Sequence, residues 1–191
     1  MKNKPKKDII ADAALSCFLA SGYGATSVDE IVKASGVSKG GIYWHFKSKE
    51  DIFLYLFERW VNQWRHNYLA SVNKTHSTAD KLTLFTEQRI RNIDTSISAL
   101  MLEFLLQSKD QETIDKMNMD IDQPTNFIFK IIEEGIAKGE FKSLNPKVLT
   151  LCFFAIFDGL SLQFLLHRNK ELLEETTRET LNIFLTGVSV P

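Results

Sequence analysis

An all-α fold is predicted for this chain of 191 residues. Apolar residues recur at three- and four-residue steps along every long segment, and no long run alternates apolar and polar residues. With 44% hydrophobic and 11% aromatic residues, the chain can bury a sizeable core. About nine helices are expected, divided between an N-terminal domain of residues 1–50 and a C-terminal domain of residues 51–191.

The first two helices are predicted from an apolar face and a capping pattern. The segment Asp8–Ser21 carries small and apolar residues at helical spacing and ends at a glycine-flanked turn, residues 22–24. Ser27 stands three residues before Glu30, the spacing at which a hydroxyl and a carboxylate cap a helix start reciprocally. A second, short helix is therefore expected directly after Ser27.

A third short helix is predicted over Lys39–Phe46, tightly turned from the second. Gly36 can adopt a left-handed conformation without steric cost, and Ser38 can cap the helix that follows. Lysine, two glycines, tyrosine, tryptophan and histidine crowd this helix, as on a surface that contacts another molecule. Two short helices joined by a tight turn are typical of a DNA-reading helix-turn-helix.

The remaining helices are predicted from apolar stripes. A long helix is expected to begin at Ser48 and continue to about Ser71, which is long enough to connect two domains. The segment Val148–Phe157 is apolar nearly all round, so its helix must be covered on two sides, by the rest of the chain or by a second copy. The other expected helices cover about residues 78–93, 95–108, 123–138, 146–168 and 170–186, the last two antiparallel.

Charge is divided unevenly along the chain, although the formal net charge is only −1. Residues 1–50 hold eight lysines and five acidic residues, which leaves 15 basic and 19 acidic residues in the remainder. The basic N-terminal end is therefore the candidate for binding DNA. Its first lysines are expected to form either an arm along the DNA or a solvated tail: Lys2, Lys4, Lys6 and Lys7.

The cysteines and the apolar segments indicate a cytoplasmic protein. Cys17 and Cys152 lack the spacing of a disulfide or metal pair, so two buried, reduced thiols are expected and no metal or other cofactor. The Lys-rich start lacks the apolar core of a signal peptide. A membrane span over Val148–Leu166 is not expected, because four polar residues, including Asp158, interrupt it.

The N-terminal residues resemble the TetR family of bacterial transcriptional regulators, most strongly over about Asp8–Trp60. The resemblance rests on Thr-Ser-Val-x-x-Ile at 26–31, Ser-Gly-Val-Ser at 35–38, Gly-x-Ile-Tyr-x-His-Phe at 40–46 and Lys-Ser-Lys-Glu at 47–50. Residues 157–163 look like the family's penultimate helix. The resemblance implies a homodimer that places two reading helices in successive major grooves of a palindromic DNA operator. The C-terminal helices would bind an effector and form the dimer interface.

Candidate DNA contacts lie at the helix starts and on the third helix. Exposed N–H groups at helix starts favour phosphate oxygens, although the hydroxyl residues there are needed as caps in any case. Lys39 can reach a guanine edge or a phosphate, and the paired glycines indicate either close approach to bases or a packing constraint. By resemblance, Tyr43 and His45 contact phosphates, Trp44 lies toward the groove, and Lys49 is the phosphate clamp. The predicted set is Thr26, Ser27, Ser38, Lys39, Gly40, Gly41, Tyr43, Trp44, His45, Lys47 and Lys49.

The C-terminal domain is rich in aromatic residues, because twelve of the fourteen phenylalanines follow residue 50. Most are expected to be core, while some line a pocket for a hydrophobic or amphipathic effector. The pocket candidates are Trp60, Trp64, Phe85, Met101, Phe104, Phe127 and Phe157, with Gln88, Arg89, Gln107, Asn126 and Asp158 as polar groups. The candidates for the dimer interface are Phe154, Asp158, Gly159, Leu162, Leu181 and Phe184.

These patterns predict a repressor that binds double-stranded DNA as a homodimer and is released by a small molecule. A constitutive DNA-binding protein or an activator, without an effector, is the alternative. A helical enzyme or carrier is disfavoured, because His66, His76 and His167 lack neighbours at metal-ligand spacing and no nucleophile motif is present.

Overall fold

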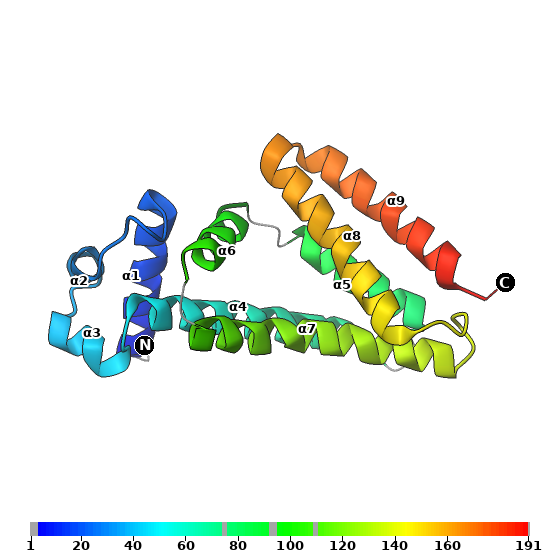
Figure 1. Cartoon of the computed structure of the whole chain (residues 1–191), viewed down its shortest axis with the longest axis horizontal. Helices are drawn as coiled ribbons and strands as arrows, with labels where there is room; N and C mark the ends of the chain where they lie inside the picture. The colour runs from blue at the N-terminus through cyan, green and yellow to red at the C-terminus, as the bar shows by residue number, and fades with distance from the viewer. Residues whose placement is uncertain (1–3, 74–75, 92–94, 109–110, 191) are drawn as a thin grey trace. The chain divides into compact units, whose positions relative to one another are not determined.

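The computed structural model describes residues 4–73, 76–91, 95–108 and 111–190, and the regular structure in these ranges is helical (Figure 1). An isolated antiparallel bridge between Phe141 and Ser189 is the one exception in them. The all-α prediction is confirmed. The helices are α1 (Lys6–Ser21), α2 (Val28–Ser35), α3 (Lys39–His45), α4 (Lys49–Ser71), α5 (Thr78–Arg91), α6 (Thr95–Gln107), α7 (Gln111–Ala137), α8 (Pro146–His167) and α9 (Lys170–Val188).

The start of α7 is the largest departure from the predicted helices. This helix begins at Gln111 and runs through Pro124, whereas the predicted helix begins near Gln123. Proline is favoured in the first turn of a helix and disfavoured in its interior, where it removes a hydrogen bond. Pro124 therefore has the sequence signature of a start, although the helix continues on both sides of it.

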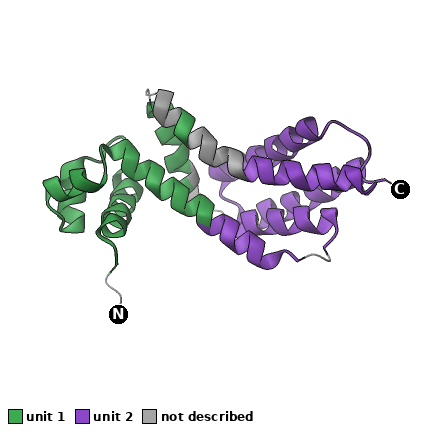
Figure 2. Cartoon of the chain, turned by 90° about the horizontal axis from the view of Figure 1, so that it is seen from below, with its two compact units in different colours: residues 1–62, 96–120 green, residues 63–95, 121–191 purple. Residues whose placement is uncertain are grey.

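The helices form two compact units, which Figure 2 colours separately. Unit 1 comprises residues 1–62 and 96–120, and unit 2 comprises residues 63–95 and 121–191. Helices α4 and α7 contribute residues to both units. Unit 1 therefore combines the N-terminal helices with α6, which comes from the middle of the sequence.

The core of unit 1 joins the α1–α2 turn, α4 and α6 through aromatic rings. The Phe53 and Phe104 rings stack at a centroid distance of 4.2 Å, and the Tyr23 ring meets them edge-on at 5.3 and 5.0 Å. From α3 and its end, Ile42 and Phe46 are buried in the same unit. The α1–α2 turn, which carries Tyr23, is therefore part of this core.

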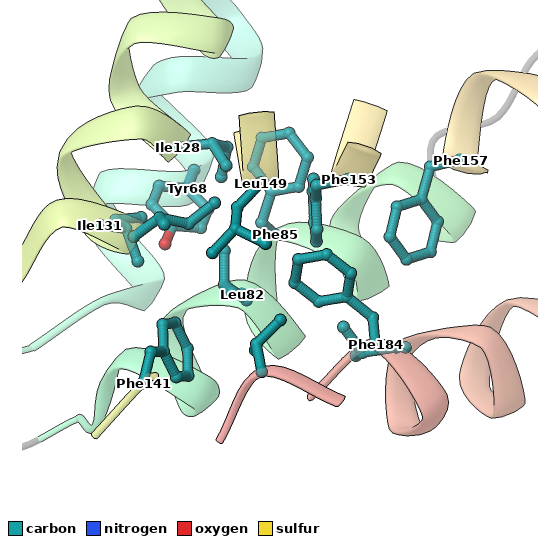
Figure 3. Close-up of a cluster of buried hydrophobic side chains, with 13 residues drawn as sticks. Tyr68, Leu82, Phe85, Ile128, Ile131, Phe141, Leu149, Phe153, Phe157 and Phe184 are labelled. Carbon is teal, nitrogen blue, oxygen red and sulfur yellow. The ribbon is translucent and has the colours of Figure 1, made fainter. Parts of the chain in front are cut away.

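The core of unit 2 is a cluster of aromatic and aliphatic side chains from α4, α5, α7, α8 and α9 (Figure 3). Phe153 lies at its centre, with ring centroids 5.7 Å from Phe85 and 5.4 Å from Phe184. Leu181 and Phe184, predicted for the dimer interface, are only 7% and 8% exposed. The prediction is corrected for these two residues, because α9 turns this stripe inward against α5 and α8.

Helix α8 carries apolar residues that the chain itself leaves exposed. They recur at three- and four-residue steps and thus share one side of the helix. Among the described helices, α8 alone is long and apolar enough to cross a membrane, which for one helix is weak evidence of a span. Cys152, predicted to be buried, is exposed on this side. We call the set the exposed face of α8: Val148, Leu151, Cys152, Ala155, Ile156, Gly159, Leu162 and Leu166.

Candidate DNA-binding surface

Capping bonds fix the two short helices of the N-terminal region. The Ser27 hydroxyl accepts from the Glu30 N–H at 3.2 Å, and the Glu30 carboxylate accepts from the Ser27 N–H at 2.6 Å. Gly36 has a φ of 67°, in the left-handed region, and ends α2. The Ser38 hydroxyl then accepts from the Gly41 N–H at 3.2 Å. The predicted caps and turn are confirmed, and α2 and α3 form a helix-turn-helix.

Helix α3 presents aromatic and basic side chains to solvent. Trp44 is 81% exposed and Tyr43 is 49% exposed, which is unusual for large aromatic residues on a short helix. The half-buried His45 ring lies edge-on to Trp44 at 5.1 Å, and Lys39 is exposed at the helix start. An exposed group of this composition is typical of a surface that binds another molecule.

The two glycines of α3 have different surroundings. A Cβ atom added at Gly41 would lie 2.8 Å from Val37 Cγ1, so packing within the chain accounts for this glycine. At Gly40, apart from the backbone of α3 itself, no heavy atom of the described residues lies within 4 Å of such a Cβ, and the backbone φ is not in the left-handed region. The chain itself has no need of glycine at Gly40. Packing within the chain therefore accounts for Gly41 but not for Gly40.

Lys39 pairs with an acidic residue that the sequence patterns did not single out. Its Nζ lies 2.8 Å from Asp29 Oδ1, and both side chains are more than half exposed. The hydrogen bond to Asp29 raises the pKa of Lys39, which keeps the ammonium group charged. Exposed pairs contribute little to stability, so Lys39 can exchange Asp29 for another partner at small cost.

Thr26 is buried, which corrects its predicted phosphate contact, and the half-buried Lys49 is hydrogen-bonded to the backbone of the chain itself. Thr26 is 2% exposed, and its hydroxyl donates to the Gly22 carbonyl oxygen at 2.7 Å. The Lys49 ammonium group donates to the carbonyl oxygens of Tyr23 at 2.7 Å, of Thr26 at 2.8 Å and of Gly24 at 3.4 Å. Three acceptors occupy its three donors, so Lys49 holds the turn before α2. Sequence motifs do not show which way a side chain points.

Lys47 and Lys49 are expected to affect DNA binding differently. Lys47 is exposed, and neutralising one phosphate contributes about 0.9 to the slope of log affinity against log salt concentration. Lys47→Met is therefore expected to reduce this slope, whereas Lys49→Met lowers the melting temperature and leaves the slope unchanged. Fluorescence anisotropy at several salt concentrations, with thermal unfolding, measures both. A reduced slope with an unchanged melting temperature for Lys49→Met would restore its phosphate role.

The candidate pocket residues divide between the two units. Unit 1 holds Trp60, Met101 and Phe104, and unit 2 holds Trp64, Phe85, Phe127 and Phe157. Phe85, Phe104 and Phe157 are buried in the cores of their units, and the other four are half-buried. The half-buried residues are therefore the better candidates for contact with a ligand.

Two of the polar candidates for ligand contact form an ion pair in unit 2. Arg89 of α5 and Asp158 of α8 are joined at 2.7 Å, and the Arg89 side chain is 31% exposed. The preceding residue, Gln88, donates to the Ser71 hydroxyl at 3.4 Å, while its buried Oε1 has no hydrogen-bond partner among the described residues. Asn126 is exposed on α7, while Gln107 belongs to unit 1, where it donates to Glu103. Arg89 thus supplies a partly exposed cation on α5 of unit 2.

Comparison with known families identifies the helix-turn-helix. Residues 10–56 match the model of the bacterial regulatory proteins of the tetR family, and residues 57–190 match the C-terminal region of QacR-like proteins. The chain belongs to the TetR family. The chain is similar to members of this family that are transcriptional regulators, and it is therefore a TetR-type regulator. The enzyme or carrier alternative is set aside.

Similarity to individual TetR-type regulators extends over the whole chain. The fatty acid metabolism regulator protein of Bacillus subtilis (strain 168) is 27% identical over 192 residues, covering 98% of each chain. The regulator QacR of Staphylococcus aureus (strain Mu50) is 29% identical over 140 residues, covering 71% of this chain and 73% of QacR. The crystal structure of FadR from Bacillus subtilis in complex with stearoyl-CoA has a TM-score of 0.84 and 26% identity, covering 94% of this chain and 98% of FadR.

Proposed function

We propose that this TetR-type regulator is a cytoplasmic repressor that binds a palindromic operator as a homodimer and is released by an amphipathic acyl ligand. Residues 1–50 supply the DNA-reading helices, and residues 51–191 supply the effector and dimer surfaces. The observation that carries the proposal is the outer surface of α3, where exposed aromatic and basic side chains flank a glycine that the chain itself does not require.

Helix α3 is the element that enters the major groove. In dimeric helix-turn-helix proteins, the N-terminal residues of the second helix meet the base edges. Lys39 and Gly40 occupy this end, so the lysine reaches a guanine and the bare backbone lies against the groove. Tyr43 and His45 contact phosphates, and Trp44 lies at the groove or its rim.

DNA phosphates also lie at the N-terminal ends of α2 and α3. The hydroxyl groups of Ser27 and Ser38 cap α2 and α3, where free N–H groups and the helix dipole favour anions. Lys47, exposed between α3 and α4, adds a cation next to the DNA backbone. These contacts set the register of the reading helix, whereas Lys39 contributes to the choice of sequence.

The exposed face of α8 is the dimer interface. Its apolar residues are costly in water, and a second copy of the same face covers them. At Gly159, apart from the backbone of α8 itself, no heavy atom in the described part of the chain lies within 4 Å of an added Cβ, which leaves room for a partner helix to approach. Asp158, Gly159 and Leu162 lie on the open side of α8, and Phe154 is half-buried. These four residues stay in the proposed interface, without Leu181 and Phe184.

The effector is an acyl chain with an anionic head group. FadR of Bacillus subtilis, which is similar over nearly the whole chain, was crystallised with stearoyl-CoA. Unit 2 has the matching chemistry, because the aromatic side chains around Trp64 and Phe127 suit an acyl chain. Arg89 can exchange Asp158 for a phosphate or carboxylate of the ligand.

The effector prediction is tested on genomic DNA fragments selected with the full-length chain. Stearoyl-CoA is expected to reduce affinity for the strongest fragment by about tenfold or more, the usual range of coupling between two sites. Gel shift against stearoyl-CoA, stearic acid and free coenzyme A measures the effect and shows which part of the ligand is required. Affinity unchanged by all three would favour the constitutive alternative.

A further inference from the structure

The turn between α1 and α2 is held by charged side chains from two other helices. The Glu103 carboxylate of α6 accepts from the N–H of Tyr23 and from the N–H of Gly24, both at 2.9 Å. The Lys49 ammonium group of α4 donates to the carbonyl oxygens of the same two residues. A negative charge thus binds the donors of the turn, and a positive charge binds its acceptors.

The contact between α6 and this turn is a packed junction within unit 1. Tyr23 is buried with its ring edge-on to the stacked rings of Phe53 and Phe104, and its hydroxyl donates to Glu50 at 3.0 Å. The hydrogen bond from the Gly24 N–H, with that from Tyr23, holds the pKa of the Glu103 carboxyl below its usual value. Glu103 is therefore ionised at neutral pH and acts as a charged acceptor, the stronger kind.

We propose that Glu103 is a positioning residue for DNA recognition, because it fixes the turn that leads into α2 and then into the reading helix α3. The turn leads directly to Ser27, the cap of α2, and α2 packs against α3. A change in the conformation of this turn therefore moves α2 and α3 together. The inference rests on the proposed DNA-binding function, and Glu103 needs no contact with DNA of its own.

The sign of the effect separates positioning from simple electrostatics. A carboxylate repels DNA phosphates, so neutralising it raises affinity for any duplex if its charge is all that matters. Loss of positioning lowers affinity for the operator instead. Glu103→Gln retains one oxygen that can accept one of the two N–H groups, whereas Glu103→Ala retains none. The two variants therefore form a graded series.

The experiment measures operator affinity of the full-length chain and its variants at several salt concentrations. Operator affinity is expected to fall about threefold for Glu103→Gln and about tenfold for Glu103→Ala, in the range of one or two lost hydrogen bonds. The salt slope stays unchanged, because no phosphate contact is removed. Glu58→Gln, which neutralises an exposed acid on α4 of the same unit, is the matched control and is expected to bind equally well or slightly better.

Amide hydrogen exchange distinguishes a local change at the turn from a general loss of stability. Exchange at Tyr23 and Gly24 is expected to speed up in Glu103→Ala while the core amides of α4 stay protected. Operator affinity at or above that of the wild type in both Glu103 variants would overturn the proposal, as would unchanged exchange at the turn. Failure of the wild-type chain to bind any genomic fragment contradicts the proposed function itself and is seen before any variant is made.

Discussion

Replacing Gly40 by alanine is expected to stabilise the chain and weaken its binding to DNA. Alanine is favoured over glycine in a helix by about 0.5–1 kcal/mol, and the new methyl group meets no heavy atom within 4 Å. In the proposed DNA complex, the same methyl group would occupy the space between α3 and the base edges. Operator affinity is therefore expected to fall about tenfold or more, which corresponds to about 1.4 kcal/mol.

Gly41→Ala is the matched control for this prediction. Its methyl group would lie 2.8 Å from Val37 Cγ1, so the helix-turn-helix must distort and the melting temperature is expected to fall. Thermal unfolding and anisotropy titration of both variants separate the two glycines. Wild-type affinity in Gly40→Ala would mean that the α3 backbone does not approach the bases.

Leu162→Lys is expected to convert the dimer to a monomer and to abolish tight operator binding. Leu162 is 49% exposed in the single chain, so a lysine there does not disturb the fold. Across the exposed face of α8 the lysine would bring two like charges together at an apolar interface. A single reading head loses the advantage of two linked sites, and affinity is expected to fall by roughly a hundredfold or more.

Leu69→Lys provides the control for a leucine of similar exposure. Leu69 lies on α4 and is 53% exposed, outside the proposed interface. Sedimentation at micromolar concentration is expected to show a dimer for wild type and Leu69→Lys and a monomer for Leu162→Lys, with the same melting behaviour in dilute solution. A dimeric Leu162→Lys would place the interface elsewhere.

Local signals predicted the helix-turn-helix because its structure depends on short-range interactions. The caps at Ser27 and Ser38 and the left-handed Gly36 each act within four residues, so the interacting residues are neighbours in the sequence. Pro124 shows where a local signal misleads. It has the character of a helix start, whereas its surroundings in α7 are those of a helix interior.

Contacts between distant residues were beyond the sequence patterns. Glu103 lies 80 residues from Tyr23, and no spacing rule connects them. The apolar stripe that includes Leu181 and Phe184 has the same pattern whether it packs inside the chain or against a second copy. Likewise, both positions are glycine in the sequence, and only the structure shows that Gly41 is packed against Val37 while Gly40 is open to a partner.

Hydroxyl-radical footprinting of the full-length chain on its selected operator tests the central claim most directly. The claim is that two copies of α3 read neighbouring major grooves. The account predicts protection related by two-fold symmetry, with half-sites centred about 34 Å apart, or about one helical turn. It also predicts that Leu162→Lys loses both protected regions together. A single protected half-site, or a pattern that Leu162→Lys leaves intact, would contradict the account.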